Sequence, residues 1–307
     1  MNSRLDLRGI LVFVAFSFCG AWLINLPLWL NGKGLQQPLA KLLLPCMMLI
    51  PAAGVAVAVF LAAKDSGWVR LAGLRLGARG WWRYWAFCWL IIPLLSIAAP
   101  FVSAALGFYS LDVREFSGFR EMIRSASGAA GMPPIPIRVL VALQLASVAV
   151  APVLNAVFAF GEEIGWRGYL LPKLLPLGQW RALILTGVVW GLWHTPVILL
   201  GHNYPKHPVL GVFFMVAFCI IFGILFGWTR LATGSVWPAV IGHGALNGSA
   251  GAVFLFSKAG TEVDTLHAGI TGWTGWILPV AVILVLAATR RIPVAGAPDD
   301  GPPTPGC

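Results

Sequence analysis

Charged residues are scarce in this chain: only 10% of its 307 residues are Asp, Glu, Lys or Arg, whereas 59% are hydrophobic. A soluble domain of this length needs a much larger charged surface to stay in solution. Together with a mean hydropathy of +0.84, this composition excludes an ordinary soluble protein and indicates a membrane protein. Each charge inside an apolar segment therefore needs an explanation, because charges are costly at bilayer depth.

Disulfide and metal-site patterns are also lacking. The five cysteines show no metal-ligand spacing and no disulfide framework. No internal repeats are visible, which argues against a transporter built from two inverted halves. The longest loops, about 64–83 and 109–137, are too short for an independent soluble domain.

Long apolar runs are what the chain has instead, and eight of them can cross the hydrocarbon core of a bilayer. They lie near residues 9–31, 41–63, 84–108, 138–161, 182–201, 208–229, 235–257 and 270–289. The fourth helix is expected to continue towards Leu171. The sequence thus predicts an all-α fold, a polytopic membrane protein with about eight transmembrane helices in one integral membrane domain over 1–292. The Pro- and Gly-rich tail, 293–307, is predicted to be disordered.

Lys and Arg in the short loops predict the orientation of the helices. With the N-terminus inside, twelve of these residues flank the cytoplasmic side and eight the outer side. We therefore predict a multi-pass protein of the cell membrane with both termini in the cytoplasm. The net charge of +10 is attributed to this topology and to contacts with membrane lipids, and not to nucleic-acid binding.

Two adjacent glutamates, Glu162 and Glu163, stand in an apolar stretch where Arg167 is the only other charge. A charge at bilayer depth costs roughly 2.5–3.5 kcal/mol, so three in one segment indicate a site. A buried ion pair that only fixes helix packing is the simpler alternative. Other polar groups in later apolar runs favour a site, because packing alone does not require them: His194, His243 and Asn247.

Helical spacing predicts different roles for the two glutamates. Glu163 and Arg167 are four residues apart and become neighbours on one helix face, as an ion pair requires. Glu162 is rotated by about 140° from Arg167 and points elsewhere. This second carboxylate, beside a like charge, is a candidate general base for activating water. The four-residue spacing recurs at Trp190 and His194 and at His243 and Asn247. Helices 4, 5 and 7 can then converge on one catalytic cavity.

These motifs resemble, in order and spacing, the three motifs of the CPBP (Abi) family, which includes the CAAX prenyl endopeptidases and bacteriocin-processing and immunity proteins. They read Glu162-Glu163-x-x-x-Arg167, Trp190-x-x-x-His194 and His243-x-x-x-Asn247. The resemblance covers about 155–250, within a CPBP-like core at about 138–257. The position of Trp190 is often Phe in this family. The resemblance implies an intramembrane endopeptidase with a cavity open to the cytoplasm. Its substrate would be a peptide or protein, with or without an attached lipid.

The same resemblance implies a role for each motif residue. Glu162, helped by His194, would activate a water that attacks the scissile carbonyl, without a metal or another cofactor. His243 and Asn247 would donate hydrogen bonds to the tetrahedral oxyanion. The site-shaping and charge-balancing pair would be Glu163 and Arg167. The roles of the two histidines can be exchanged without altering any sequence feature, so that assignment stays open.

Other functions are compatible with the same residues. A zinc hydrolase would use Glu162, His194 and His243 as ligands, with an open position for water, although the compact His-Glu-x-x-His helix is missing. A non-proteolytic membrane protein of this fold would act in peptide or bacteriocin immunity or in lipid binding. A proton-coupled transporter is disfavoured by the lack of repeats. The remaining histidines, His202, His207 and His267, are interpreted as interfacial polar residues.

Overall fold

The fold is all-α, as predicted. A computed structural model describes residues 5–62, 72–78, 80–128 and 132–294, and within them the only bridge of the β type joins Leu111 and Ser257. The first half of the chain forms α1 (Leu7–Leu30), η1 (Gly34–Gln36), α2 (Ala40–Met47), α3 (Ile50–Ala62), α5 (Trp82–Ala86), the π-helical η2 (Phe87–Ile91), α6 (Ile92–Ala105), α7 (Ser117–Ser127) and α8 (Ile137–Leu154).

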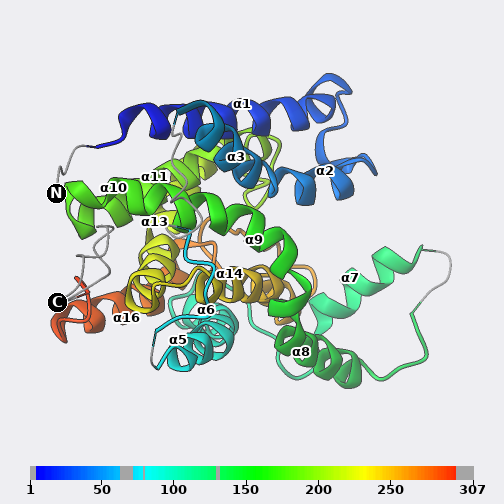
Figure 1. The fold of residues 1–307 in the computed structure, drawn as a ribbon. Coiled ribbons are helices and arrows are strands. Elements are labelled where there is room, and N and C mark those ends of the chain that lie inside the picture. Colours follow the sequence, from blue (N-terminus) through cyan, green and yellow to red (C-terminus); the bar gives the residue numbers. More distant parts are fainter. Residues whose placement is uncertain (1–4, 63–71, 79, 129–131, 295–307) are drawn as a thin grey trace.

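The second half carries the motifs. It forms α9 (Ala156–Gly165), the π-helical η4 (Trp166–Leu170), α10 (Leu171–Leu174), η5 (Leu175–Leu177), α11 (Gln179–Trp193), α12 (Thr195–Ile198), α13 (Pro208–Thr233), α14 (Trp237–Ser249), α15 (Ala252–Leu255), η6 (Trp273–Trp276) and α16 (Ile277–Ala288). Figure 1 shows α1 and α3 along one side of the bundle and α5, α6 and α8 along the other. The motif helices α9, α11 and α14 lie between them, together with α13, so the polar residues are surrounded by protein.

Five helical stretches of the described residues are long and apolar enough to cross a membrane, which agrees with a polytopic membrane protein. They are Leu7–Leu30, Ala40–Leu61, Trp82–Ala105, Ile137–Leu154 and Pro208–Thr233. The other three predicted spans are shorter helices: α11 has 15 residues, α14 has 13, and Trp273–Ala288 is a short apolar helix. The expected count of eight therefore includes three helices that fall short of a full span.

The fourth apolar run continues towards Leu171, as predicted, but as a broken path through α8, α9, η4 and α10. The break at Asn155 is stabilised by its amide, which donates to Ala151 O at 3.0 Å and to Gly244 O on α14 at 3.3 Å. Pro152 lies in the last turn of α8, where it cannot donate a backbone hydrogen bond. The break redirects the chain so that α9 packs against α3 and α14.

Glycines allow α11 and α13 to pack closely. A Cβ on Gly187 would lie 2.6 Å from Ile220 Cα, and one on Gly191 would clash with the backbone at Val216. Helices that pack within a membrane commonly use small residues in this way, because the backbones can then approach each other. The close approach brings the α11 motif next to α13 and its buried aromatic residues.

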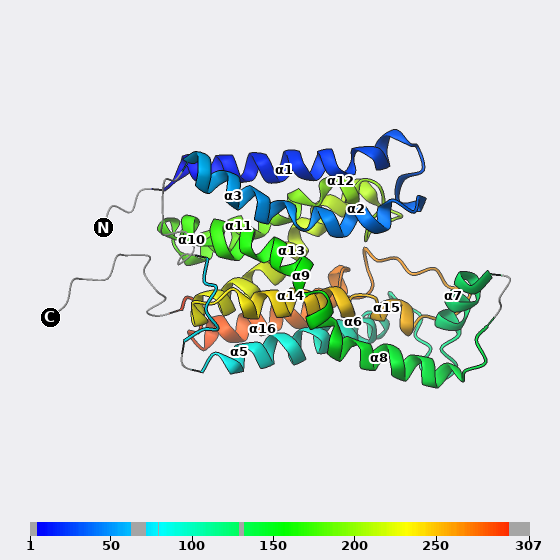
Figure 2. The same cartoon turned by 45° about the vertical axis from the view of Figure 1, so that its right-hand side comes forward.

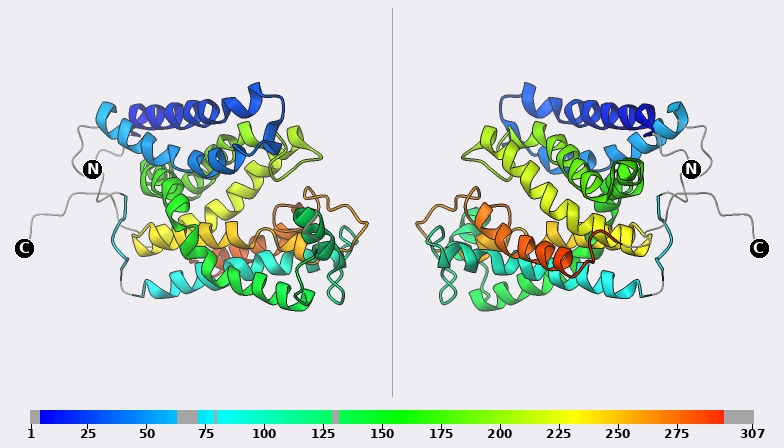
Figure 3. Two further views of the ribbon diagram at one scale, coloured as in Figure 1. Left: turned by 90° about the vertical axis from the view of Figure 1, so that its right-hand side faces the viewer. Right: turned by 90° about the vertical axis from the view of Figure 1, so that its left-hand side faces the viewer.

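The start of α1 and the end of α16 lie at the same end of the bundle (Figure 2). Near them, Lys173 Nζ pairs with Asp6 Oδ2 at 2.6 Å and Gln179 donates to Val294 O at 3.0 Å. The start of α1 and the end of α16 again lie on the same side in the views of Figure 3, away from the loop that follows α12. At that far end of α1, Trp29 Nε1 donates to Pro196 O at 3.1 Å. The predicted disordered tail lies, from residue 295 on, outside the described residues.

Candidate active site

All four predicted catalytic residues line one cavity of about 340 Å³. Glu162 comes from α9, His194 from the end of α11, and both His243 and Asn247 from α14. The expected convergence of three helices on one cavity is therefore what the structure contains. Glu162 and His243 are buried, at 2% and 4% exposure, whereas Asn247 is the most accessible of the four.

Glu163 and Arg167 form the expected ion pair behind the cavity wall. Their atoms Oε1 and Nη1 are 2.8 Å apart, and both side chains are completely buried. The same Glu163 oxygen accepts a second hydrogen bond, from His243 Nδ1 at 2.8 Å. One carboxylate thus connects α9, the π-turn after it and α14. Breaking one side of such a buried pair is costly, because the remaining charge is uncompensated.

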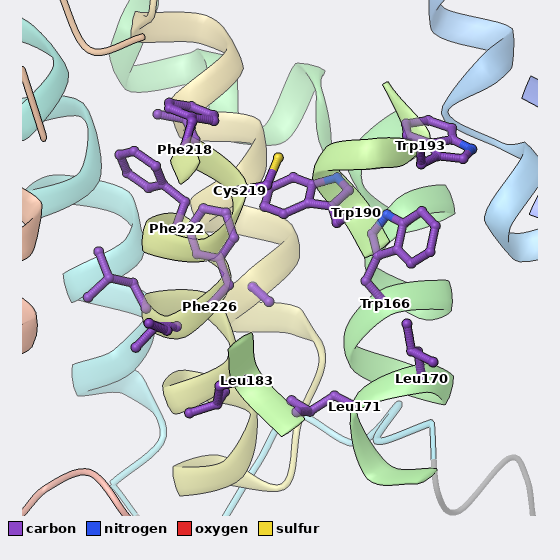
Figure 4. Close-up of a cluster of buried hydrophobic side chains, with 14 of the residues drawn as sticks. Trp166, Leu170, Leu171, Leu183, Trp190, Trp193, Phe218, Cys219, Phe222 and Phe226 are labelled. Carbon is purple, nitrogen blue, oxygen red and sulfur yellow. The ribbon is translucent and has the colours of Figure 1, made fainter. Parts of the chain in front are cut away.

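The Arg167 guanidinium lies among aromatic rings as well as beside its carboxylate. Its central carbon is 4.3 Å from the centre of the Trp190 ring and 5.4 Å from that of Phe226. Figure 4 shows these two rings in the buried cluster that fills the space between α11 and α13. Nε and Nη2 of Arg167 have no hydrogen-bond partner within the described part of the chain. Cation–π attraction to the ring faces compensates part of the cost of leaving these two nitrogens without a hydrogen bond, and this attraction is strongest where water is excluded.

Glu162 is held by two indoles and not by a charged group. Its Oε2 accepts from Trp190 Nε1 at 2.6 Å and from Trp166 Nε1 at 3.3 Å. No residue of the described chain donates to Oε1, which leaves that oxygen for a molecule in the cavity. The expectation that the two glutamates differ in role is supported by this geometry. Trp166 was not singled out from the sequence, although its four-residue distance from Glu162 was a usable signal.

The two cavity histidines are held differently, and this separates their chemistry. His194 Nδ1 lies 2.8 Å from the Trp190 carbonyl oxygen. A carbonyl only accepts, so Nδ1 carries the proton and Nε2 of the neutral ring is an acceptor. His243 Nδ1 instead faces the Glu163 carboxylate, which stabilises an imidazolium whose Nε2 is a donor. The geometry therefore favours one of the two assignments that the sequence left open: His194 presents an acceptor to the cavity, and His243 presents a donor.

His202 lines the same cavity, together with Asn203 and Thr271. The interpretation of His202 as an interfacial residue did not include this position in the cavity wall. Nothing in its sequence surroundings signals this position, because the loop after α12 is brought to the cavity by tertiary packing. The other two histidines do lie outside the cavity lining: His207 Nε2 is 3.1 Å from Asp264 Oδ2, and His267 Nδ1 accepts from Trp273 Nε1 at 2.9 Å.

The cavity extends towards the end of the bundle opposite the termini. His202 and Asn203 follow α12, and the Pro196 carbonyl of α12 accepts from Trp29 at the far end of α1. With both termini in the cytoplasm, this part of the cavity lies towards the outer side. The cytoplasmic termini and the cavity open to the cytoplasm both stay predictions, and they are compatible only if the cavity opens at the end of the bundle where the termini lie.

Within the described residues, no three His, Cys, Asp or Glu side chains are grouped so that they could hold a metal ion. The ligands of the alternative zinc hydrolase, Glu162, His194 and His243, line a common cavity but do not form such a group.

Asn25, another polar residue of the helices, donates through its amide to Ala21 O of the same helix, α1, at 2.8 Å and to Met47 Sδ on α2 at 3.1 Å. It has a packing role and lies outside the cavity lining.

Comparison with known proteins supports the resemblance. Residues 143–249, roughly a third of the chain, match the family model described as type II CAAX prenyl endopeptidase Rce1-like. Over 44 residues the chain is 43% identical to a protein named CAAX prenyl protease 2 from Methanococcus maripaludis, which is 14% of this chain and 16% of that protein. No solved structure matches the chain. The motif-bearing segment is thus Rce1-like, as the resemblance to the CPBP family implied.

Proposed function

We propose that this protein is a CAAX-protease-like intramembrane endopeptidase, in which Glu162 activates a water to hydrolyse a peptide bond. The observation that carries the proposal is the environment of Glu162: one carboxylate oxygen is held by two indoles, and the other is left for a cavity that two imidazoles and an amide also line. The Rce1-like match over residues 143–249 supports a protease in preference to the non-proteolytic alternatives.

The first step is attack by water. Glu162 takes one proton as the water oxygen bonds to the scissile carbonyl carbon. His194 Nε2, an acceptor because its Nδ1–H is held by the Trp190 carbonyl, takes the second hydrogen bond of that water and orients it. The water is therefore held by two acceptors, which suits a molecule that donates two hydrogen bonds.

The second step is stabilisation of the oxyanion. His243 is supported from behind by Glu163, so its Nε2–H donates towards the cavity. The Asn247 side-chain amide, one helical turn further along α14, supplies the second donor. Such fixed donors in a water-poor site are usually the largest single contribution to acyl-transfer catalysis. Collapse of the intermediate then breaks the C–N bond, and the proton held by Glu162 passes to the leaving amine.

The decisive test is Glu162→Gln. The amide oxygen can still accept from Trp166 and Trp190, so the fold should be retained, but an amide cannot take a proton from water. Turnover of a fluorogenic peptide in detergent or proteoliposomes should fall about 10²–10⁴-fold, with an unchanged unfolding temperature. The exposed Glu115→Gln serves as the matched control and should keep wild-type turnover. Activity of Glu162→Gln within a few-fold of wild type would refute the role given to Glu162.

A further inference from the structure

We infer that His202 is a substrate-binding residue, which donates a hydrogen bond to an acceptor oxygen of the peptide on the side of the scissile bond away from Glu162. This inference rests on the proposed peptidase function. Its starting point is that His202 and Glu162 line the same cavity from different elements, the loop after α12 and helix α9. The cavity thus has a polar wall that the motif residues do not supply.

The His202 ring has no hydrogen-bond partner among the residues that the structure describes. Among the described residues its backbone N–H donates to Val197 O at 3.0 Å and its carbonyl accepts from Tyr204 N at 2.7 Å, but no group bonds to the imidazole. Its neighbours on the wall, Asn203 and Thr271, are also polar. A partly buried imidazole without a partner is unfavourable unless another molecule supplies one.

The loop that carries His202 is fixed to the segment before η6 at several points. Tyr204 Oη donates to Thr271 O at 2.9 Å, and Thr265 Oγ1 donates to Asn203 O at 2.5 Å. Two further contacts join the same two segments: His207 Nε2 lies 3.1 Å from Asp264 Oδ2, and Lys206 forms an ion pair with Glu262 at 2.9 Å.

The backbone of this wall is also constrained. Asn203 has φ 61°, a left-handed conformation in which Asn is among the better-tolerated residues. Tyr204 is only 1% exposed and packs closely against Gly211 of α13. A Cβ added to Gly211 would lie 2.6 Å from the Cβ of Tyr204. The wall therefore stays in place without any contribution from the His202 ring. A preorganised group of this kind costs little entropy when it binds a ligand.

The ring is suited to donate to a neutral or an anionic oxygen. Burial lowers the pKa of His202 to about 4, so at neutral pH the ring is uncharged and carries one N–H donor and one acceptor nitrogen. It lines the same cavity as His194, and the two imidazoles interact electrostatically. Two acceptors fit this chemistry: a backbone carbonyl of the peptide, or its free terminal carboxylate.

The experiment compares His202→Ala with wild type on one quenched-fluorescence decapeptide, made with a C-terminal carboxylate and with a C-terminal amide. We expect His202→Ala to raise KM about tenfold, the effect of one lost hydrogen bond, with kcat changed less than twofold. An effect on both forms assigns the contact to a backbone carbonyl, and an effect on the acid alone assigns it to the carboxylate. His202→Gln, which keeps an N–H donor, should recover most of the lost affinity.

The matched control is His207→Ala, a histidine of the same loop whose ring pairs with Asp264 outside the cavity lining. It should leave KM unchanged. Unchanged KM in His202→Ala for both peptides, or an equal rise in His207→Ala, overturns the inference while the proposed function stands. If wild type cleaves neither form, the proposed function fails. Affinity of the labelled peptides for wild type and His202→Ala, measured by fluorescence anisotropy, then decides the inference, and equal affinities refute it.

Discussion

Replacing Arg167 by Met should destabilise the protein by about 3–5 kcal/mol, because Glu163 would stay buried without its counter-charge. The two charged atoms are 2.8 Å apart and neither side chain is exposed. At an effective dielectric constant of about 20, the gross attraction at this distance is about 6 kcal/mol, and desolvation offsets a large part of it. Met fills most of the space against Trp190 and Phe226, so the measured loss reports the charge and not a cavity.

A double-mutant cycle separates this pair from its surroundings. Arg167→Met and Glu163→Gln should each destabilise, and the double variant should be more stable than the sum of the single effects implies, with a coupling energy of about 2 kcal/mol. The cycle of Arg167→Met with Glu162→Gln should give less than about 0.5 kcal/mol, because Glu162 bonds to indoles instead.

The assay is reversible unfolding of the purified protein in mixed micelles, followed by tryptophan fluorescence and fitted with a separate slope for each variant. Equal slopes exclude a change in the denatured state as the source of the stability differences. If Glu162 couples to Arg167 as strongly as Glu163 does, the two carboxylates do not have separate environments. That result would also refute the assignment of Glu162 as the general base.

Four further outcomes are expected. Trp190→Phe removes the 2.6 Å indole donor from Glu162, the proposed general base, and should lower kcat about tenfold or more, as loss of a hydrogen bond to a charged group implies. Trp193→Phe removes an indole that donates to a backbone carbonyl on α1, and it should leave kcat unchanged. Turnover should survive strong chelation, and elemental analysis should find well under one zinc per chain; stoichiometric zinc with chelator-sensitive turnover would establish the rival mechanism. Burial lowers the pKa of His202 from 6.5 to about 4, so the unfolded state binds more protons than the native one between these values and stability should fall as pH decreases through that window; the fall should be smaller in His202→Gln, measured by unfolding at pH 4 to 7. In a cysteine-free background, Asn203→Cys and Val294→Cys should react with an impermeant maleimide from opposite sides of the membrane, and labelling from one side would contradict the arrangement of cavity and termini.

Much of the site could be predicted from the sequence because it depends on helical geometry. The Glu163–Arg167 pair follows from a spacing of four residues, and so does the divergence of Glu162 from Arg167. Both hold in the structure even though a π-turn begins at Trp166, since the pair precedes most of that turn. The all-α fold also follows from composition, because a backbone in hydrocarbon must satisfy its own hydrogen bonds.

The number of full spans was less accessible to prediction. Apolar runs mark segments that avoid water. A short helix buried inside the bundle avoids water just as a helix that crosses the bilayer does, so the two kinds of helix have the same hydropathy. The runs at 182–201 and 235–257 each contain a break, after Trp193 and after Ser249. Hydropathy does not detect such breaks, because they alter the backbone direction and not the polarity of the residues.

The sequence by itself determined that this is a helical membrane protein, that it carries a paired and an unpaired glutamate, and that its motifs resemble those of CPBP proteins. Each of these depends on composition or on residues within one helical turn. Only the tertiary structure decided that Trp190 donates to Glu162, that Glu163 supports His243, 80 positions away, and that His202 joins the cavity wall. These contacts depend on how closely α11, α13 and α14 pack and on where the loop after α12 is fixed, and residue periodicity carries no information on distances between separate elements.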